Sequence, residues 1–261
     1  MSRGNSDDAI DHRRVGVLHV HTSYSRDGLD TPEQVRDFAA ERGIGFVGLT
    51  DHAEDLRADR WEGYVEHCRA ASDAAVRLIP GLEFRFDGCP GLHLLALGLS
   101  RWIEPGTPGE FVAMTEGVAQ FTIVAHPVLA RYRVPPEVRA GVDAIEIWNA
   151  SYNTRYLPDP RAIRLLREIR LARSGVVGTA GLDQHDRRND RETRVIVRNA
   201  DVDPLVQLRA GEFENTGRTM RVDSAADLGS ARLGLLSVLR WTLDHVERVQ
   251  DRVARSGRRS G

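Results

Sequence analysis

Lysine is absent from this sequence of 261 residues, and all 36 basic residues are arginine. A Schiff-base enzyme needs a lysine amine, and a P-loop needs the lysine of its GxxxxGK[ST] motif. Some metal centres are bridged by a carboxylated lysine. The composition therefore excludes all three kinds of site.

Cysteine and long apolar runs are scarce as well. The two cysteines, Cys68 and Cys89, make no disulfide framework, and we expect a reduced, cytoplasmic chain. No apolar run approaches the roughly 18 residues of a membrane helix, so no membrane partner is expected. The formal net charge of -2 gives no reason to expect binding to long duplex nucleic acid.

Short apolar runs alternate with helical patterns along most of the chain. Thr31 and Pro32 are typical of the N-cap and first residue of a helix, and a second helix is expected over 160–172. Such alternation predicts the α/β class with a parallel sheet. Seven expected strands predict a closed or nearly closed barrel, with its chemistry at the C-terminal strand ends. These strands are 15–18, 46–49, 76–79, 92–97, 121–125, 144–148 and 176–179.

The C-terminal part of the chain shows a different pattern. Apolar residues recur at steps of three and four over 224–255, which predicts a long helix, and Ser224 with Asp227 resembles a capping box. We expect a barrel over 1–222, and a helix with a disordered end over 223–261 that belongs to the same domain. A helix packed on the barrel and a dimerisation helix are both consistent with this pattern, so monomer and homodimer stay open.

Histidines and carboxylates gather at the ends of the expected strands. Residues two apart in a strand point to one face, so His19 and His21 can reach one metal ion. Only His93 precedes its apolar run, a conflict that a boundary error of two to four residues would remove. Buried histidines and carboxylates are costly unless paired or metal-bound, so the pattern predicts a metal site. The groups are His19 with His21, Asp51 with His52, Glu83, His93, His126, and Asp183 with His185, with Asp27 in a nearby turn as a weaker candidate.

These motifs, taken in order along the chain, resemble the PHP (polymerase and histidinol phosphatase) family. The resemblance runs from about residue 15 to 216 and rests on 19–28, 50–52, 80–83, 93–98, 125–127, 181–185 and the closing segment 209–213. It implies a distorted seven-stranded (β/α)7 barrel that holds two or three divalent metal ions. The implied ligands are His19, His21, Glu83 and Asp183 for the first ion, Glu83, His93 and His126 for the second, and Asp27, His52 and His185 for the third. Asp51 would orient a ligand.

Mixed imidazole and carboxylate ligands suit zinc, manganese or iron and do not choose among them. Water on such ions ionises near neutral pH and can attack phosphorus, so we expect hydrolysis of a small phosphomonoester or nucleotide. His52, Asp51 or a bound water would protonate the leaving group. Arginine suits the phosphate. Of the arginines that follow expected strand ends, Arg155 and Arg187 are the first candidates, ahead of Arg26 and Arg85.

Three other functions remain open. An amidohydrolase-like enzyme acting on C–N bonds can also begin with an HxH motif, although Glu83, the Thr50–His52 motif and the missing lysine weigh against its two-metal form. A non-catalytic PHP-like binding module is the second alternative, and a nuclease for short oligonucleotides is the third. Neither the fold nor the metal site specifies the substrate.

Overall fold

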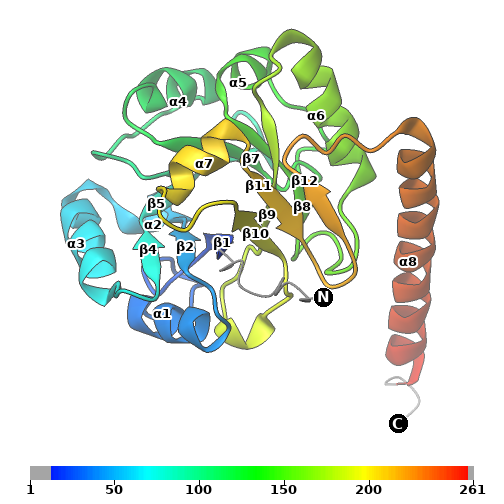
Figure 1. Ribbon diagram of the computed structural model, residues 1–261, viewed down its shortest axis with the longest axis horizontal. Coiled ribbons are helices and arrows are strands. Elements are labelled where there is room, and N and C mark those ends of the chain that lie inside the picture. The colour runs from blue at the N-terminus through cyan, green and yellow to red at the C-terminus, as the bar shows by residue number, and fades with distance from the viewer. Residues whose placement is uncertain (1–12, 258–261) are drawn as a thin grey trace, which may run out of the picture.

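Two six-stranded sheets form the centre of the computed structural model, which describes residues 13–257 and places side chains as far as Leu243 (Figure 1). The first sheet has the order β12 (Arg221–Asp223), β11 (Phe213–Thr216), β10 (Arg194–Val197), β1 (Arg14–Val20), β2 (Phe46–Leu49), β4 (Arg77–Ile79). The second has the order β3 (Asp51–His52), β5 (Gly81–Arg85), β6 (His93–Leu97), β7 (Phe121–Ala125), β8 (Ala144–Asn149), β9 (Val177–Gly181).

The predicted α/β class is confirmed, whereas the seven-stranded barrel is not. Within residues 13–257 the strands form two sheets and no closed barrel. The sheets are also mixed, because β6 runs antiparallel to β5 and β7, and β10 runs antiparallel to β1 and β11. The sheets meet where β2 continues into β3 through Thr50 and where Val20 bridges Gln184. The last three strands follow one another without long helices, a pattern that the expected alternation does not contain.

Helices flank the sheets, and two of them begin as the sequence predicts. At the start of α1, Thr31 accepts a hydrogen bond from the Gln34 amide while the Gln34 side chain accepts one from Thr31. Helix α6 has the predicted bounds, with Asp159 as its N-cap. The α-helices are α1 (Pro32–Glu41), α2 (Ala53–Leu56), α3 (Trp61–Ala71), α4 (Pro108–Thr115), α5 (Pro136–Gly141), α6 (Pro160–Ala172), α7 (Pro204–Ala210) and α8 (Ser230–Gly257), and 3₁₀ turns cover Ala58–Arg60 and Arg187–Asn189.

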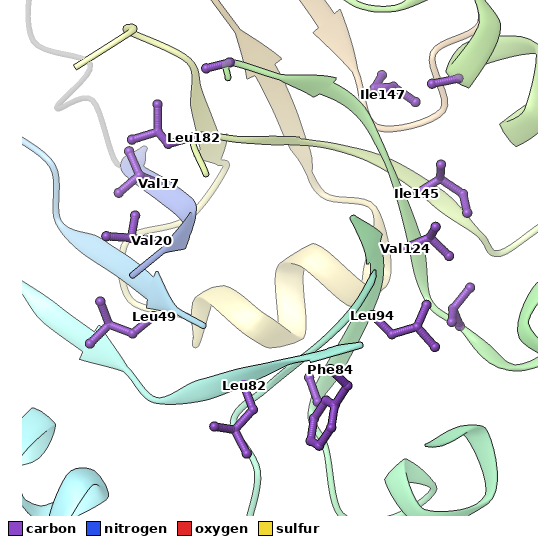
Figure 2. Packing of buried hydrophobic residues seen from close by; sticks show 14 of the residues in the cluster. Val17, Val20, Leu49, Leu82, Phe84, Leu94, Val124, Ile145, Ile147 and Leu182 are labelled. Carbon is purple, nitrogen blue, oxygen red and sulfur yellow. The ribbon is translucent and has the colours of Figure 1, made fainter. Parts of the chain in front are cut away.

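Apolar side chains fill two clusters on opposite faces of the strands. Neighbours along a strand alternate between them, so that Leu94 belongs to one cluster and Leu95 to the other. Figure 2 shows the first cluster, where Leu82, Phe84 and Val124 project from their strands toward the surrounding helices. This packing fixes the strands on both faces and leaves their ends free to carry polar groups.

Helix α8 starts later than the sequence predicts. The Ser224 hydroxyl donates to the Gly211 carbonyl at 2.6 Å instead of capping a helix, so the predicted capping box is wrong and α8 begins at Ser230. Leu233 and Leu236 are buried, and α8 contacts α6 while extending along the side of the molecule (Figure 1). The disordered end expected from Arg255 onward falls partly on 258–261, which lie outside the described residues. Among the described helices, none combines the length and apolarity needed to cross a membrane.

Candidate metal centre

Glu83 lies at the centre of the predicted ligand cluster. Its two carboxylate oxygens lie 2.6–3.6 Å from ring nitrogens of five histidines, and the side chain is buried. These five are His19, His21, His52, His93 and His126. One carboxylate that faces so many imidazoles is placed to bridge more than one metal ion.

Asp183 supplies a second carboxylate on the same side of the cluster. Its Oδ1 atom lies 3.4 Å from Nε2 of His19 and 3.4 Å from Nε2 of His21. Asp183 is buried, as Glu83 is, and it lies among the same imidazoles. Glu83 and Asp183 therefore both face Nε2 of His19 and Nε2 of His21.

A third group lies nearer the surface. The Asp27 carboxylate reaches Nε2 of His52 at 3.4 Å and Nε2 of His185 at 3.5 Å, and its side chain is 56% exposed. The ring of His185 stacks on that of His21 with a 4.1 Å separation of centroids. Asp27 thus approaches the histidines that the sequence assigned to a third metal ion, from a turn open to solvent.

The donor atoms fit divalent metal ions. Nε2 of His19 and Nε2 of His21 are buried and have no hydrogen-bond partner, although both point at carboxylates. A buried polar atom without a partner is costly, and a metal bond removes that cost. Four sets of ligand atoms lie within 4.8 Å of one another: His19, His21 and Glu83; Glu83, His93 and His126; His19, His126 and Asp183; and His21, His52 and His185.

Unusual backbone conformations place three of these ligands. His19 has a φ of 63°, His126 of 22° and Asp183 of 49°, and each such non-glycine residue costs about 1–3 kcal/mol. The pairing of β1 with β2 also shifts register between Val17 and Val20. His19 and His21 do converge as expected, but through this irregularity and not through regular strand alternation.

His93 lies at the end of the second sheet from which His126 also projects, for a reason that the sequence analysis missed. Strand β6 begins at His93 and runs antiparallel, so His93 pairs with Arg85 at the end of β5 and with Ala125 at the end of β7. The expected strand boundary was therefore right to within one residue, and the assumption of a parallel strand was wrong.

Glu146 contacts two residues of the cluster, and the sequence analysis did not select it. It is buried in β8, where its carboxylate accepts hydrogen bonds from Nδ1 of His19 at 2.8 Å, the His126 amide at 2.6 Å and the Asn149 side chain at 2.9 Å. Gly181 gives it room, since a Cβ there would lie 2.0 Å from the Glu146 carboxylate. A lone carboxylate inside the apolar run 144–148 was the available signal.

Asp51 holds the loop that follows His21. Its oxygens accept hydrogen bonds from the amide and hydroxyl of Thr22 and from the amide and hydroxyl of Ser25, at 2.7–3.1 Å. The Ser25 hydroxyl oxygen in turn accepts from the His52 amide at 2.9 Å. These contacts favour the orienting role for Asp51 over proton donation to a leaving group.

The structure changes the order of the arginines expected to bind phosphate, because Arg85 lies nearer the cluster than Arg155 and Arg187 do. Nη2 of Arg85 lies 2.9 Å from Nε2 of His52, so Arg85 borders the cluster. Arg155 stacks on the Tyr156 ring at 5.5 Å, and Arg187 pairs with Asp30. Neither Arg155 nor Arg187 makes a described contact with the metal ligands. Tyr152, from the loop after β8, does so, with its ring 4.8 Å from that of His126.

The close contacts within the cluster shift the pKa values of its own residues. Burial opposes the charged form of His19, but Glu146 and Asp183 outweigh it and raise its pKa well above the usual value. Burial also opposes ionisation of Glu83, yet the surrounding histidines hold the pKa of Glu83 well below the usual value, and the pKa of Asp183 is lowered likewise. Both carboxylates are therefore ionised at neutral pH, as metal ligands must be.

A PHP domain model matches residues 18–134, which include the predicted ligands from His19 to His126. Over 89 residues the chain is 36% identical to an error-prone DNA polymerase of Mycobacterium bovis, a match that covers 31% of this chain and 8% of the polymerase. Over 94 residues it is 33% identical to a phosphoribosyl 1,2-cyclic phosphate 1,2-diphosphodiesterase of Eggerthella lenta, covering 35% of this chain and 32% of that enzyme. The matches thus span well under two thirds of either relative.

The fold resembles that of a solved two-domain protein from Bacteroides vulgatus, described as containing a PHP-like metal-dependent phosphoesterase. The TM-score is 0.58 at 18% identity, and the match covers 80% of this chain and 66% of that one. At this identity the likeness concerns the fold. It extends beyond residue 134 and so includes part of the chain outside the domain match.

Proposed function

We propose that this chain, a member of the PHP domain family, hydrolyses a small phosphate ester with water activated by divalent metal ions. The observation that carries this proposal is the buried Glu83 carboxylate facing five histidines. Nε2 of His19 and Nε2 of His21 face Glu83 and Asp183 without a hydrogen-bond partner. Divalent ions held there would supply Lewis acidity and a hydroxide at neutral pH.

The ligand sets support two or three ions. His19, His21, Glu83 and Asp183 would hold the first ion, and Glu83, His93 and His126 the second. His52 and His185, with Asp27, would hold the third. Zinc, manganese and iron all suit these imidazole and carboxylate donors.

Two side chains support binding of the ester itself. Arg85 presents a half-exposed guanidinium beside His52, where it can neutralise a phosphate oxygen. Tyr152 is partly exposed and covers His126, so its ring can contact the organic part of the ester. In a centre of two ions, His52 would be free of metal, and it lies between Arg85 and Asp27, where it could orient or protonate a leaving oxygen. The substrate that we propose is a small phosphomonoester or nucleotide.

The proposal is tested by measuring bound metal in protein purified without chelators, together with phosphate release from a panel of phosphomonoesters and phosphodiesters. We expect at least two ions per chain and turnover that chelation abolishes and added manganese or zinc restores. His19→Ala should lose both metal and turnover, while His67→Gln, a half-exposed histidine outside the cluster, should keep both.

Other outcomes point to the alternatives. A protein that binds metal and cleaves C–N bonds but no phosphoester would be an amidohydrolase-like enzyme. A protein that binds no metal even after reconstitution would overturn the proposal and favour a non-catalytic binding module. A cytoplasmic location and the choice between monomer and homodimer stay predictions.

A further inference from the structure

A cavity of about 790 Å³ opens beside the metal centre, between the β5–β6 loop and the β7–α5 loop. Its volume lies in the range of small-molecule sites. Leu92 in its wall directly precedes His93, and the amide of Leu129 donates to the His126 carbonyl at 3.0 Å. The two loops that line the cavity therefore lead directly to two of the proposed metal ligands, His93 and His126.

The lining of this cavity combines apolar walls with positive charge. Leu92, Ala130 and Val134 supply buried apolar surface. Arg131 and Arg133 also line it, and no lining residue is acidic. Their guanidinium groups are exposed and have no hydrogen bond or ion pair with any other described residue, in contrast to Arg139, which donates to the Val134 carbonyl at 2.8 Å.

The loop that carries these arginines is held in a strained shape. Arg131 and Tyr132 are consecutive left-handed residues with φ of 51° and 61°, at a cost of about 1–3 kcal/mol each. The Tyr132 hydroxyl donates to Asp159 at 2.6 Å and its amide donates to the Pro127 carbonyl at 2.8 Å, which fixes the loop. Gly91 lets the facing loop approach, since a Cβ there would lie 2.5 Å from the Leu129 carbonyl oxygen. The cavity is thus preformed.

We infer that this cavity binds the organic part of the substrate, and that this part is an apolar, ring-sized group bearing a second negative charge. The apolar walls would cover the ring, and Arg131 and Arg133 would pair with the charge. The inference rests on the proposed function only in identifying the ligand as a substrate. Binding of an aromatic anion is expected whether or not the chain hydrolyses phosphate esters.

Cys89 provides a probe that needs no catalysis. It lines the cavity and is partly exposed, whereas the other cysteine, Cys68, is buried. The experiment compares the rates at which Cys89 of the metal-loaded protein reacts with two aromatic disulfides, anionic 5,5′-dithiobis(2-nitrobenzoate) and uncharged 4,4′-dithiodipyridine. In both reactions the thiolate attacks one sulfur of the reagent, so that a mixed disulfide forms on Cys89 and the S–S bond of the reagent breaks. The half that leaves, 2-nitro-5-thiobenzoate from the anionic reagent or 4-thiopyridone (after uptake of a proton) from the uncharged one, is measured by absorbance.

We expect Arg131→Gln combined with Arg133→Gln to slow the anionic reagent roughly tenfold and to leave the uncharged reagent unchanged, because the local positive potential concentrates anions. The matched control removes two exposed arginines elsewhere, Arg101→Gln with Arg232→Gln, and should slow neither reagent. An equal effect of both double variants on the anionic reagent would overturn the inference. Reaction of two thiols instead of one would reveal unfolding, since Cys68 is buried.

A second measurement uses the unaltered protein. Naphthalene-1-sulfonate should protect Cys89 from the uncharged reagent, whereas uncharged 1-naphthalenemethanol and inorganic phosphate should protect it much less. Equal protection by the first two compounds would show that charge plays no part and would overturn the inference. Failure to hydrolyse any phosphoester, with protection intact, would contradict the proposed function and leave the binding site standing.

Discussion

Glu146 accepts a hydrogen bond of 2.8 Å from Nδ1 of His19, and this contact turns Nε2 of the same ring toward Glu83 and Asp183. The carboxylate fixes both the tautomer and the orientation of a proposed ligand, as partners of metal-bound histidines commonly do. Glu146 also accepts from the His126 amide, so that one buried side chain positions two ligands.

Replacing Glu146 by glutamine should therefore weaken metal binding by about 10–100-fold, because the neutral amide stabilises the imidazole less and can present its NH₂ group to Nδ1. Competition with a chromogenic chelator measures the affinity. Glu168→Gln is the matched control, since that side chain is 65% exposed on α6. Equal affinities in the two variants would show that Glu146 does not support the centre.

Metal affinity should rise with pH. The nearby carboxylates raise the pKa of His19 well above its usual value, so in the metal-free protein a proton occupies the ring through neutral pH and must leave when metal binds. The affinity should climb as the pH approaches the raised pKa, with release of protons that a weakly buffered titration can count. A pH-independent affinity, with no proton release, would contradict the assignment of His19 as a ligand.

The metal-free protein should be most stable at intermediate pH. The raised pKa of His19 means that the folded state binds this proton more tightly, a stabilisation present below the unfolded pKa and lost as the pH rises through the folded pKa. The lowered pKa values of Glu83 and Asp183 contribute stability above their unfolded values that is lost in acid. The melting temperature of protein freed of metal by a chelator should therefore be highest at a pH between the lowered pKa values of the two carboxylates and the raised pKa of His19. Monotonic stabilisation by alkali would contradict this balance.

Asp51→Asn should lower the free energy of unfolding by about 1–3 kcal/mol, because a buried acceptor of hydrogen bonds from Thr22 and Ser25 would be replaced by a group that also donates. Urea unfolding measures the change. Asp87→Asn, an exposed aspartate, is the control. If Asp51→Asn were as stable as the control but lost turnover, the residue would act on the substrate and not on the loop.

The sequence predicted which side chains come together better than it predicted the fold. Histidines and carboxylates near strand ends are a local signal, so His19, Glu83 and Asp183 could be grouped without knowing the strand order, although they come from two sheets. Strand direction is not a local property. His93 reads as misplaced until β6 is known to run antiparallel, and the short strands β10–β12 depend on long-range pairing.

The residues that contact the predicted ligands were harder still to predict than the ligands themselves. Glu146 lies within an apolar strand, and only the tertiary structure shows which residues it supports. Arg155 and Arg187 follow expected strand ends as Arg85 does, but one stacks on Tyr156 and the other pairs with Asp30. Spacing along the sequence identifies the backbone position of an arginine. The direction of its guanidinium depends on the side chains around it, which the sequence does not show.

Arg85 is the arginine whose loss should most affect the proposed reaction. Its guanidinium lies 2.9 Å from Nε2 of His52 and is half-exposed, so it can contact a phosphate oxygen at the cluster. A hydrogen bond to a charged group is worth about 1.5–3 kcal/mol, which corresponds to a loss of roughly 10–150-fold in kcat/KM for Arg85→Gln. Arg155→Gln, in the loop between β8 and α6, should change kcat/KM by less than about twofold, because the Arg155 guanidinium stacks on Tyr156. Steady-state kinetics on the best ester from the panel, with metal content verified in each variant, measures both. A larger loss for Arg155→Gln than for Arg85→Gln would reverse their assignment and place the phosphate at the loop after β8.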